Sequence, residues 1–458
     1  MTFTSNLFLI GIIPWYIMIA YLLRKIRYSK TILIFLGNCV FYIWGGVGAF
    51  FYICAFAVVL WGFTRIISVT KNKYIFAFLI VLTSIPLILV KYTVFFISNL
   101  NAICHFTIQV PKIVVPIGIS FFTFEAISLL TDTYRNEILY SNSVLDTLLY
   151  ITFFPTVTSG PILRYNSFKE GLISPISPDN YNDSILRIAR GLCKKILIAD
   201  KIAILADYYF DGVSRGNTYS VVGLWMGSIA YTLQLYFDFS GYSDMAIGIG
   251  GLLGFQIPEN FKLPYQARSI SDFWKRWHIS LSQWFRDYIY IPLGGNRCSV
   301  NRHIFNMLVV WLLTGIWHGA DWSFVVWGIG YFFLLILEKY VPGMKRITES
   351  RFGHIYTLFF VNLLWIPFRS KNLFTAKQYI FGLAGIRSRG TIESIALEYI
   401  PYVIVAILLC CPIDRGFTPL KNRKGYKVLK GIAVLIAVFW AMCAVLNTTY
   451  TPYIYGNF

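Results

Sequence analysis

A histidine lies within an apolar stretch that is long enough to cross a membrane. His318 belongs to the motif Trp317-His318-Gly319, and the surrounding residues from Met307 to Leu337 include no Lys or Arg and one acid, Asp321. Ionisable side chains at membrane depth are costly and usually face a protein interior or a water-filled cavity. Because imidazole exchanges protons near neutral pH, we expect His318 to act as a general base, with Trp317 beside it contacting substrate.

The role of Asp321 has two interpretations. On a continuous helix it would share a face with His318 and could fix the tautomer of the ring, or contact substrate itself. Alternatively, Asp321 marks the membrane boundary. His318 also has a plain alternative, a buried histidine that bonds a backbone carbonyl and serves only packing.

The segment Arg268–Arg297 contains a second histidine within an aromatic pattern. Ser271 is a plausible N-cap, and apolar residues recur at helical spacing on a stripe made of Phe273, Trp277, Leu281, Trp284 and Tyr288. The pattern predicts a tryptophan-rich amphipathic helix at the membrane interface. His278 falls on an adjoining apolar stripe, so we expect it to face the same interior as His318. Arg276 is a candidate substrate contact, although the simpler interpretation is an aromatic anchor whose basic groups meet lipid phosphates.

Two acids and two hydroxyls occur in Asp238-Phe-Ser-Gly-Tyr-Ser-Asp244, before several glycines. We expect a helix break here, because broken helices with polar groups often line substrate pathways. Asp238, Ser240 and Asp244 are therefore candidate substrate contacts; a hydrogen-bonded structural kink is the alternative. The sequence contains no G-x-S-x-G, Walker loop or H-E-x-x-H, so hydrolase, nucleotide and metalloprotease functions have no support, and no metal site is expected.

The composition is that of a polytopic helical membrane protein. Of the 458 residues, 57% are hydrophobic and only 13% are charged, whereas soluble domains carry about a quarter charged residues. The net charge of +19 comes from clusters between apolar stretches, a positive-inside pattern that argues against nucleic-acid binding. The eight cysteines form no C-x-x-C pair, so neither a disulfide framework nor a zinc site is expected.

We expect one all-α domain over residues 1–458 that crosses a membrane several times. The apolar stretches predict about eleven full spans plus re-entrant and interfacial helices, with interruptions at Pro155–Pro161 and Asp238–Gly241. Basic clusters after the first span and before the last place both ends outside. The start, Met1 to Leu23, has no basic residue before Arg24 and is expected to remain as the first span.

Motifs spread over nearly the whole chain resemble those of the membrane-bound O-acyltransferase (MBOAT) family. The resemblance is to the bacterial branch that acetylates polysaccharides, as in alginate O-acetylation. It is carried by MTFTSNLFL, VPIGISFFTF, DTYR, FFPTVTSGPILRY, DFSGYSDMAIGIGGLLGF, RSISDFWKRWHISLSQWFRDYIYIPLGGNR, LLTGIWHGADW and PYIYGNF.

The resemblance implies a ring of helices with His318 as the catalytic histidine and His278 as a second signature position, where a cytoplasmic donor tunnel meets an outer funnel. It implies no bound cofactor. The donor would be a thioester of CoA or an acyl carrier protein, and the acceptor a cell-surface polysaccharide, in some members reached through an extracytoplasmic acetyltransferase partner. Two positions depart from the family pattern. Glu125 replaces an expected Gln, and Gly330-Tyr331 replaces Tyr-His.

Two other functions are compatible with the same residues. A transporter or flippase would also use broken helices and intramembrane polar groups, but it would not consume a thioester. An acyltransferase of the same fold could carry D-alanine or a longer acyl chain in place of acetyl, which analysis of envelope esters would reveal.

Overall fold

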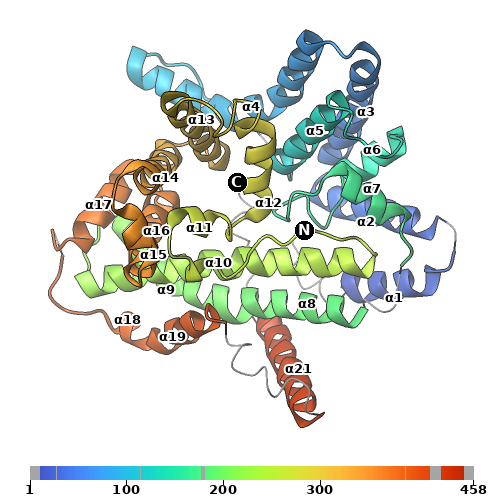
Figure 1. Ribbon diagram of the computed structural model, residues 1–458. Helices are drawn as coiled ribbons and strands as arrows, with labels where there is room; N and C mark the ends of the chain where they lie inside the picture. Colours follow the sequence, from blue (N-terminus) through green and yellow to red (C-terminus); the bar gives the residue numbers. More distant parts are fainter. Residues whose placement is uncertain are drawn as a thin grey trace. The chain divides into compact units, whose positions relative to one another are not determined.

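The computed structural model describes residues 11–26, 28–113, 115–176, 181–386, 388–412 and 424–447, and its regular elements are helices (Figure 1). The first ten residues and the PYIYGNF tail lie outside this described part. Within it, the predicted all-α class is confirmed; the one isolated β-bridge joins Ser220 and Arg389.

The described residues group into two compact units. One holds residues up to Ile188 together with Ser243–Pro258, and the other holds Ala189–Tyr242 and residues from Glu259 onward. The helices α8 and α10 contribute residues to both units. The predicted single domain over residues 1–458 stays a prediction.

Polar side chains cap or anchor several helices of the first unit. Its helices are α1 (Ile13–Leu23), α2 (Ser29–Gly45), α3 (Val47–Thr70), α4 (Lys73–Cys104), α5 (Ile119–Tyr134), α6 (Val144–Ile151), α7 (Tyr165–Ile173) and most of α8 (Tyr181–Cys193). Asn72 caps α4, and Ser143 forms a capping box at α6. The amine of Lys30 is buried and donates to the carbonyl oxygens of Gly171 and Ser174, so this basic residue is structural.

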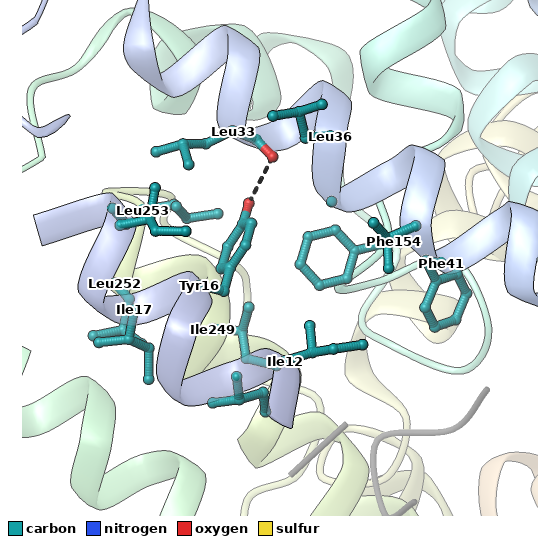
Figure 2. Close-up of a pocket in the computed structure, with 15 residues that line it drawn as sticks. Ile12, Tyr16, Ile17, Leu33, Leu36, Phe41, Phe154, Ile249, Leu252 and Leu253 are labelled. Atoms are coloured by element: carbon teal, nitrogen blue, oxygen red, sulfur yellow. Dashed lines mark hydrogen bonds between the residues drawn. The ribbon is translucent and has the colours of Figure 1, made fainter. Parts of the chain in front are cut away.

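An apolar pocket of about 140 Å³ lies in the first unit between α1, α2 and the end of α10 (Figure 2). Tyr16 contributes its ring and donates its hydroxyl to the carbonyl oxygen of Leu33 at 3.1 Å. Phe154 borders the pocket from the turn after α6, in the segment where prolines and a glycine predicted an interruption. That interruption is confirmed, because the chain forms turns between Ile151 and Tyr165.

The second unit carries both candidate histidines. Its elements are η3 (Lys194–Ala199), α9 (Asp200–Ser214), the first part of α10 (Val221–Leu252), η4 (Pro264–Gln266), α11 (Ile270–Trp274), α12 (Ile279–Phe285), η5 (Arg286–Tyr290), α13 (Val300–His318), α14 (Trp322–Tyr340), α15 (Met344–Glu349), α16 (Phe352–Arg369), α17 (Leu373–Leu383), α18 (Ser394–Glu398), α19 (Ile400–Leu409) and α21 (Lys424–Asn447).

Helices α13 and α14 pack closely because glycines face each other across their contact. A Cβ atom on Gly315 would lie 2.5 Å from the carbonyl oxygen of Phe324, and one on Gly328 would lie 2.4 Å from that of Trp311. Small residues allow helix backbones in membranes to approach in this way. The close approach sets His318, at the end of α13, beside side chains of α14.

Three helices in the described residues are long and apolar enough to cross a membrane, namely Val47–Thr70, Lys73–Cys104 and Trp322–Tyr340. Shorter apolar helices are Ile13–Leu23, Ser29–Gly45, Ile400–Leu409 and Gly431–Leu446. The predicted count of about eleven spans is therefore not confirmed, since many apolar stretches of the sequence form short or interrupted helices.

Candidate active site

His318 is the last residue of α13 and is buried, with 2% of its surface exposed. Aromatic rings surround its imidazole. The ring centroids of Trp317, Trp327 and Phe368 lie 4.8, 4.9 and 5.1 Å from it, the last two from α14 and α16. The sequence-based expectation that this histidine faces a protein interior is confirmed. The apolar pocket of the first unit is lined by other residues, so the donor tunnel and outer funnel stay predictions.

Further polar aromatic side chains lie next to this shell. The ring of Trp327 contacts those of Trp274 at 5.8 Å and Tyr331 at 5.2 Å. The indole N–H groups of Trp274 and Trp327 and the hydroxyl of Tyr331 are buried, and none has a hydrogen-bond partner among the residues that the structure describes. A buried donor without a partner costs about 1–3 kcal/mol, so such groups are suited to a ligand that accepts their hydrogen bonds.

His278 is fully buried and begins a helix in the left-handed region, with φ of 44°. Its Nδ1 lies 3.2 Å from Oδ1 of Asn260, which also accepts from the backbone N–H and the hydroxyl of Ser280. Because an amide oxygen only accepts, this assignment of the Asn260 side chain places the imidazole proton on Nδ1 and leaves Nε2 as the basic nitrogen.

Trp317 connects the neighbourhoods of the two histidines. Its ring lies 6.4 Å from that of His278 and 4.8 Å from that of His318. Phe239 of α10 closes the other side of His278 with an edge-on contact at 4.7 Å. The structure therefore brings both sequence-predicted histidines into one aromatic neighbourhood.

The predicted continuous interfacial helix from Ser271 is wrong. Ser269 is the N-cap, α11 ends at Trp274, and a new helix begins at His278. The aromatic stripe packs inside the protein: Phe273, Trp277, Leu281 and Trp284 are all buried. Helical spacing correctly marked one face as apolar, but that face contacts protein and not the lipid interface.

The predicted helix break at Asp238–Gly241 is also wrong, because α10 is continuous through these residues. In the second unit Asp238 forms a buried ion pair with Lys195 at 2.6 Å, and Lys195 also contacts Asp200 at 2.8 Å. In the first unit Asp244 pairs with Arg187 at 2.5 Å. Both acids have structural partners, so direct substrate contact by either of them stays a prediction.

Three other candidates take positions that the sequence did not indicate. Asp321 caps α14 by accepting the N–H of Ser323 at 2.8 Å, and Gly319 is extended, so the single helical face predicted for Asp321 and His318 does not exist. Arg276 pairs with Asp272 at 2.9 Å in a partly exposed setting. Ser240 is buried in α10. Substrate contacts by these residues stay predictions.

Sequence reasoning missed Trp274, Trp327 and Tyr331 as site residues. Trp327 and Tyr331 are four residues apart on α14, a spacing that places both on one helix face. Tyr331 occupies a position at which a histidine was expected by resemblance, so a hydroxyl stands in the aromatic neighbourhood there. Glu125, the other departure, is buried in α5 of the first unit.

Comparison with known proteins identifies the family. Residues 118–375 match the membrane-bound O-acyltransferase family, MBOAT. The probable alginate O-acetylase AlgI of Pseudomonas putida is 36% identical over 396 residues, covering 82% of this chain and 79% of that protein. The peptidoglycan O-acetyltransferase of Helicobacter pylori is 36% identical over 328 residues, 65% of this chain and 62% of that protein.

A more distant relative is named for the transfer of a different acyl group, D-alanyl. The teichoic acid D-alanyltransferase of Streptococcus thermophilus is 30% identical over 319 residues, covering 66% of this chain and 73% of that protein. Residues 118–375, which match the family, include both buried histidines and the aromatic residues around them. The chain belongs to the membrane-bound O-acyltransferase family.

Proposed function

We propose that this protein transfers an acetyl group from a cytoplasmic thioester to a hydroxyl of an extracytoplasmic polysaccharide, in the bacterial cytoplasmic membrane. The main supporting observation is the buried imidazole of His318, which contacts the ring of Trp327. The indole N–H of Trp327 has no hydrogen-bond partner among the described residues. The relatives named as alginate and peptidoglycan acetylating enzymes support acetyl as the group and a glycan as the acceptor.

In this mechanism His318 takes the proton of the acceptor hydroxyl while the hydroxyl oxygen attacks the carbonyl carbon of the thioester. The new C–O bond forms, negative charge develops on the carbonyl oxygen, and the C–S bond then breaks. The leaving thiolate receives the proton from the imidazolium, so protons balance without another reactant. Proton transfer by a positioned side chain contributes about 10²–10⁴-fold to the rate.

The indole N–H of Trp327 supplies a donor for the developing oxyanion. Its ring contacts the His318 ring directly, and the Tyr331 hydroxyl lies on the same helix face. Donors fixed before the reaction in a site without water stabilise transition-state charge, and loss of one costs about 10²–10³ in kcat. The burial of Trp327 and Tyr331 supplies that fixed, dry environment.

The central experiment replaces His318 with asparagine, which keeps a polar group near Nδ1 but removes the base. Purified His318→Asn in detergent, given an acetyl thioester and an oligosaccharide, is expected to form ester at least about a hundredfold more slowly than the unmodified protein. The matched control is His105→Asn at the exposed C-terminal end of α4. Ester formation by folded His318→Asn at the unmodified rate would refute the proposal.

D-alanyl transfer is the second candidate, favoured by the 30% identity to a teichoic acid D-alanyltransferase. The two candidates share the chemistry at His318 and differ in the acyl group. Mass analysis of envelope esters from cells with and without the active protein separates acetyl from D-alanyl.

A further inference from the structure

A second pocket, of about 550 Å³, lies in the second unit away from the histidines. It is lined by the end of α9, the turn between α9 and α10, and the segment that contains Arg389. Its volume falls in the range of small-ligand sites, about 300–1,000 Å³. Its lining is mixed in charge and carries an exposed aromatic ring, which sets it apart from the apolar pocket of Figure 2.

Hydrogen bonds hold the walls of this pocket in place. Glu393 accepts from the backbone N–H and the hydroxyl of Ser220, each at 2.8 Å, and from the Tyr209 hydroxyl at 3.0 Å. The Arg389 backbone N–H donates to the Tyr219 carbonyl oxygen at 2.9 Å, and its guanidinium donates to Thr218 at 3.2 Å. The two chain segments are thus joined, so the pocket exists before any ligand arrives, which lowers the entropy cost of binding.

The charges that line the pocket oppose each other. Asp207 and Asp211 stand on one turn of α9, both bonded by Arg369 at 2.6 and 3.3 Å, and Arg215 and Arg389 line the same space. Acids would repel a phosphate or another compact anion, and the arginines would repel a cation. Carboxylates, guanidinium groups and Asn217 together offer both acceptors and donors, as a ligand rich in hydroxyls requires.

One aromatic ring presents an apolar surface to this polar space. Tyr208 is 42% exposed, and its ring is backed by Tyr209 at 5.1 Å and Tyr219 at 5.3 Å. The backing fixes its orientation, and an aromatic face packs well against the C–H groups of a sugar ring. Hydrogen-bond donors and acceptors for hydroxyl groups, arranged around one oriented aromatic ring, are the features that bind a pyranose.

We infer that this pocket binds a pyranose segment of the glycan acceptor, with Tyr208 as the stacking residue. The inference rests on the proposed acetyl transfer to a glycan, because it assigns a place where the polymer is held. A polymer held at a second site on the same protein would have its hydroxyls at a raised local concentration.

The test measures glycan binding by the full-length protein in detergent, using cellohexaose, chitohexaose and hexamannuronate as probes. Tyr208→Ala is expected to weaken binding of at least one neutral hexasaccharide by about tenfold or more. The matched control is Tyr402→Ala, because Tyr402 has similar exposure, 46%, on α19 outside the pocket. Equal affinity in Tyr208→Ala and Tyr402→Ala would overturn the inference.

Two further outcomes are informative. Binding of hexamannuronate alone that is abolished by salt and unchanged in Tyr208→Ala would identify an anion site and also overturn the inference. Failure of every probe to bind the unmodified protein would do the same. The measurements are repeated in His318→Asn, in which glycan affinity is expected to persist while ester formation falls. A failed binding result is thereby distinguished from a failure of the proposed transfer chemistry.

Discussion

Trp327→Phe removes one hydrogen-bond donor from the surroundings of His318 while keeping an aromatic ring. Trp327 is fully buried, and its N–H has no partner among the described residues. If this donor stabilises the oxyanion, its loss is expected to lower kcat about 10²–10³-fold, or about 2.7–4 kcal/mol of transition-state stabilisation.

The same change has opposing effects on folding. Removing a buried donor without a partner relieves about 1–3 kcal/mol, whereas the smaller ring leaves a cavity that costs a comparable amount. Net stability is therefore expected to stay within about 1–2 kcal/mol of the unmodified protein. A large loss of activity with little loss of stability is the signature of a donor used in the reaction.

The assay follows thiol release at saturating acyl thioester and acceptor, with thermal unfolding measured on the same preparation. Trp365→Phe is the matched control, because Trp365 is equally buried and stacks against Trp327, 5.8 Å between centroids. A wild-type kcat in Trp327→Phe would refute the assigned role. An equal loss in both variants would also refute it, because repacking would then explain the effect.

The remaining predictions concern ion pairs and carboxylates. Lys195→Met removes the cation that pairs with the buried Asp238 at 2.6 Å, and it is expected to cost about 3–5 kcal/mol of unfolding free energy. Asp238→Asn is expected to cost less, because Lys195 keeps its ion pair with Asp200. The reverse order in thermal or denaturant unfolding would contradict this. Partial burial raises the pKa of Glu393, but hydrogen bonds from Ser220 outweigh it and hold the pKa below its ordinary value of 4.5. The stabilisation by Glu393 is therefore complete above pH about 4.5 and is lost as the pH falls through the lower folded-state pKa. The difference in melting temperature between the unmodified protein and Glu393→Gln should shrink on acidification. A difference that does not change with pH would count against this prediction.

The helical class and the buried state of His318 could be predicted from the sequence because both follow from hydrophobicity over long stretches. The interruption at Pro155–Pro161 was predictable for a local reason, since proline removes a backbone donor and restricts the residue before it. The apolar face around Trp277 was also visible in the spacing, although its partner, protein or lipid, was not.

The errors arose where a distant segment decides the outcome. The charge of Asp238 suggested a break in α10, but Lys195 neutralises it and the helix continues. The sequence did not indicate the turn at His278, because its residue type does not mark a left-handed conformation as glycine would and the hydrophobic spacing continues through it. The donors of Trp327 and Tyr331 could not be singled out, because a sequence does not show which buried N–H or O–H lacks a partner.

The tryptophans that touch His318 make this part of the protein optically accessible. Indole emission changes with the polarity of its surroundings and is quenched by a neighbouring imidazolium, and the rings of Trp317 and Trp327 lie within 5 Å of His318 between centroids. The difference between the emission of the unmodified protein and that of Trp327→Phe isolates one chromophore from the 13 in the chain. Arrival of an acyl donor could thus be timed by stopped-flow spectroscopy without attaching a label.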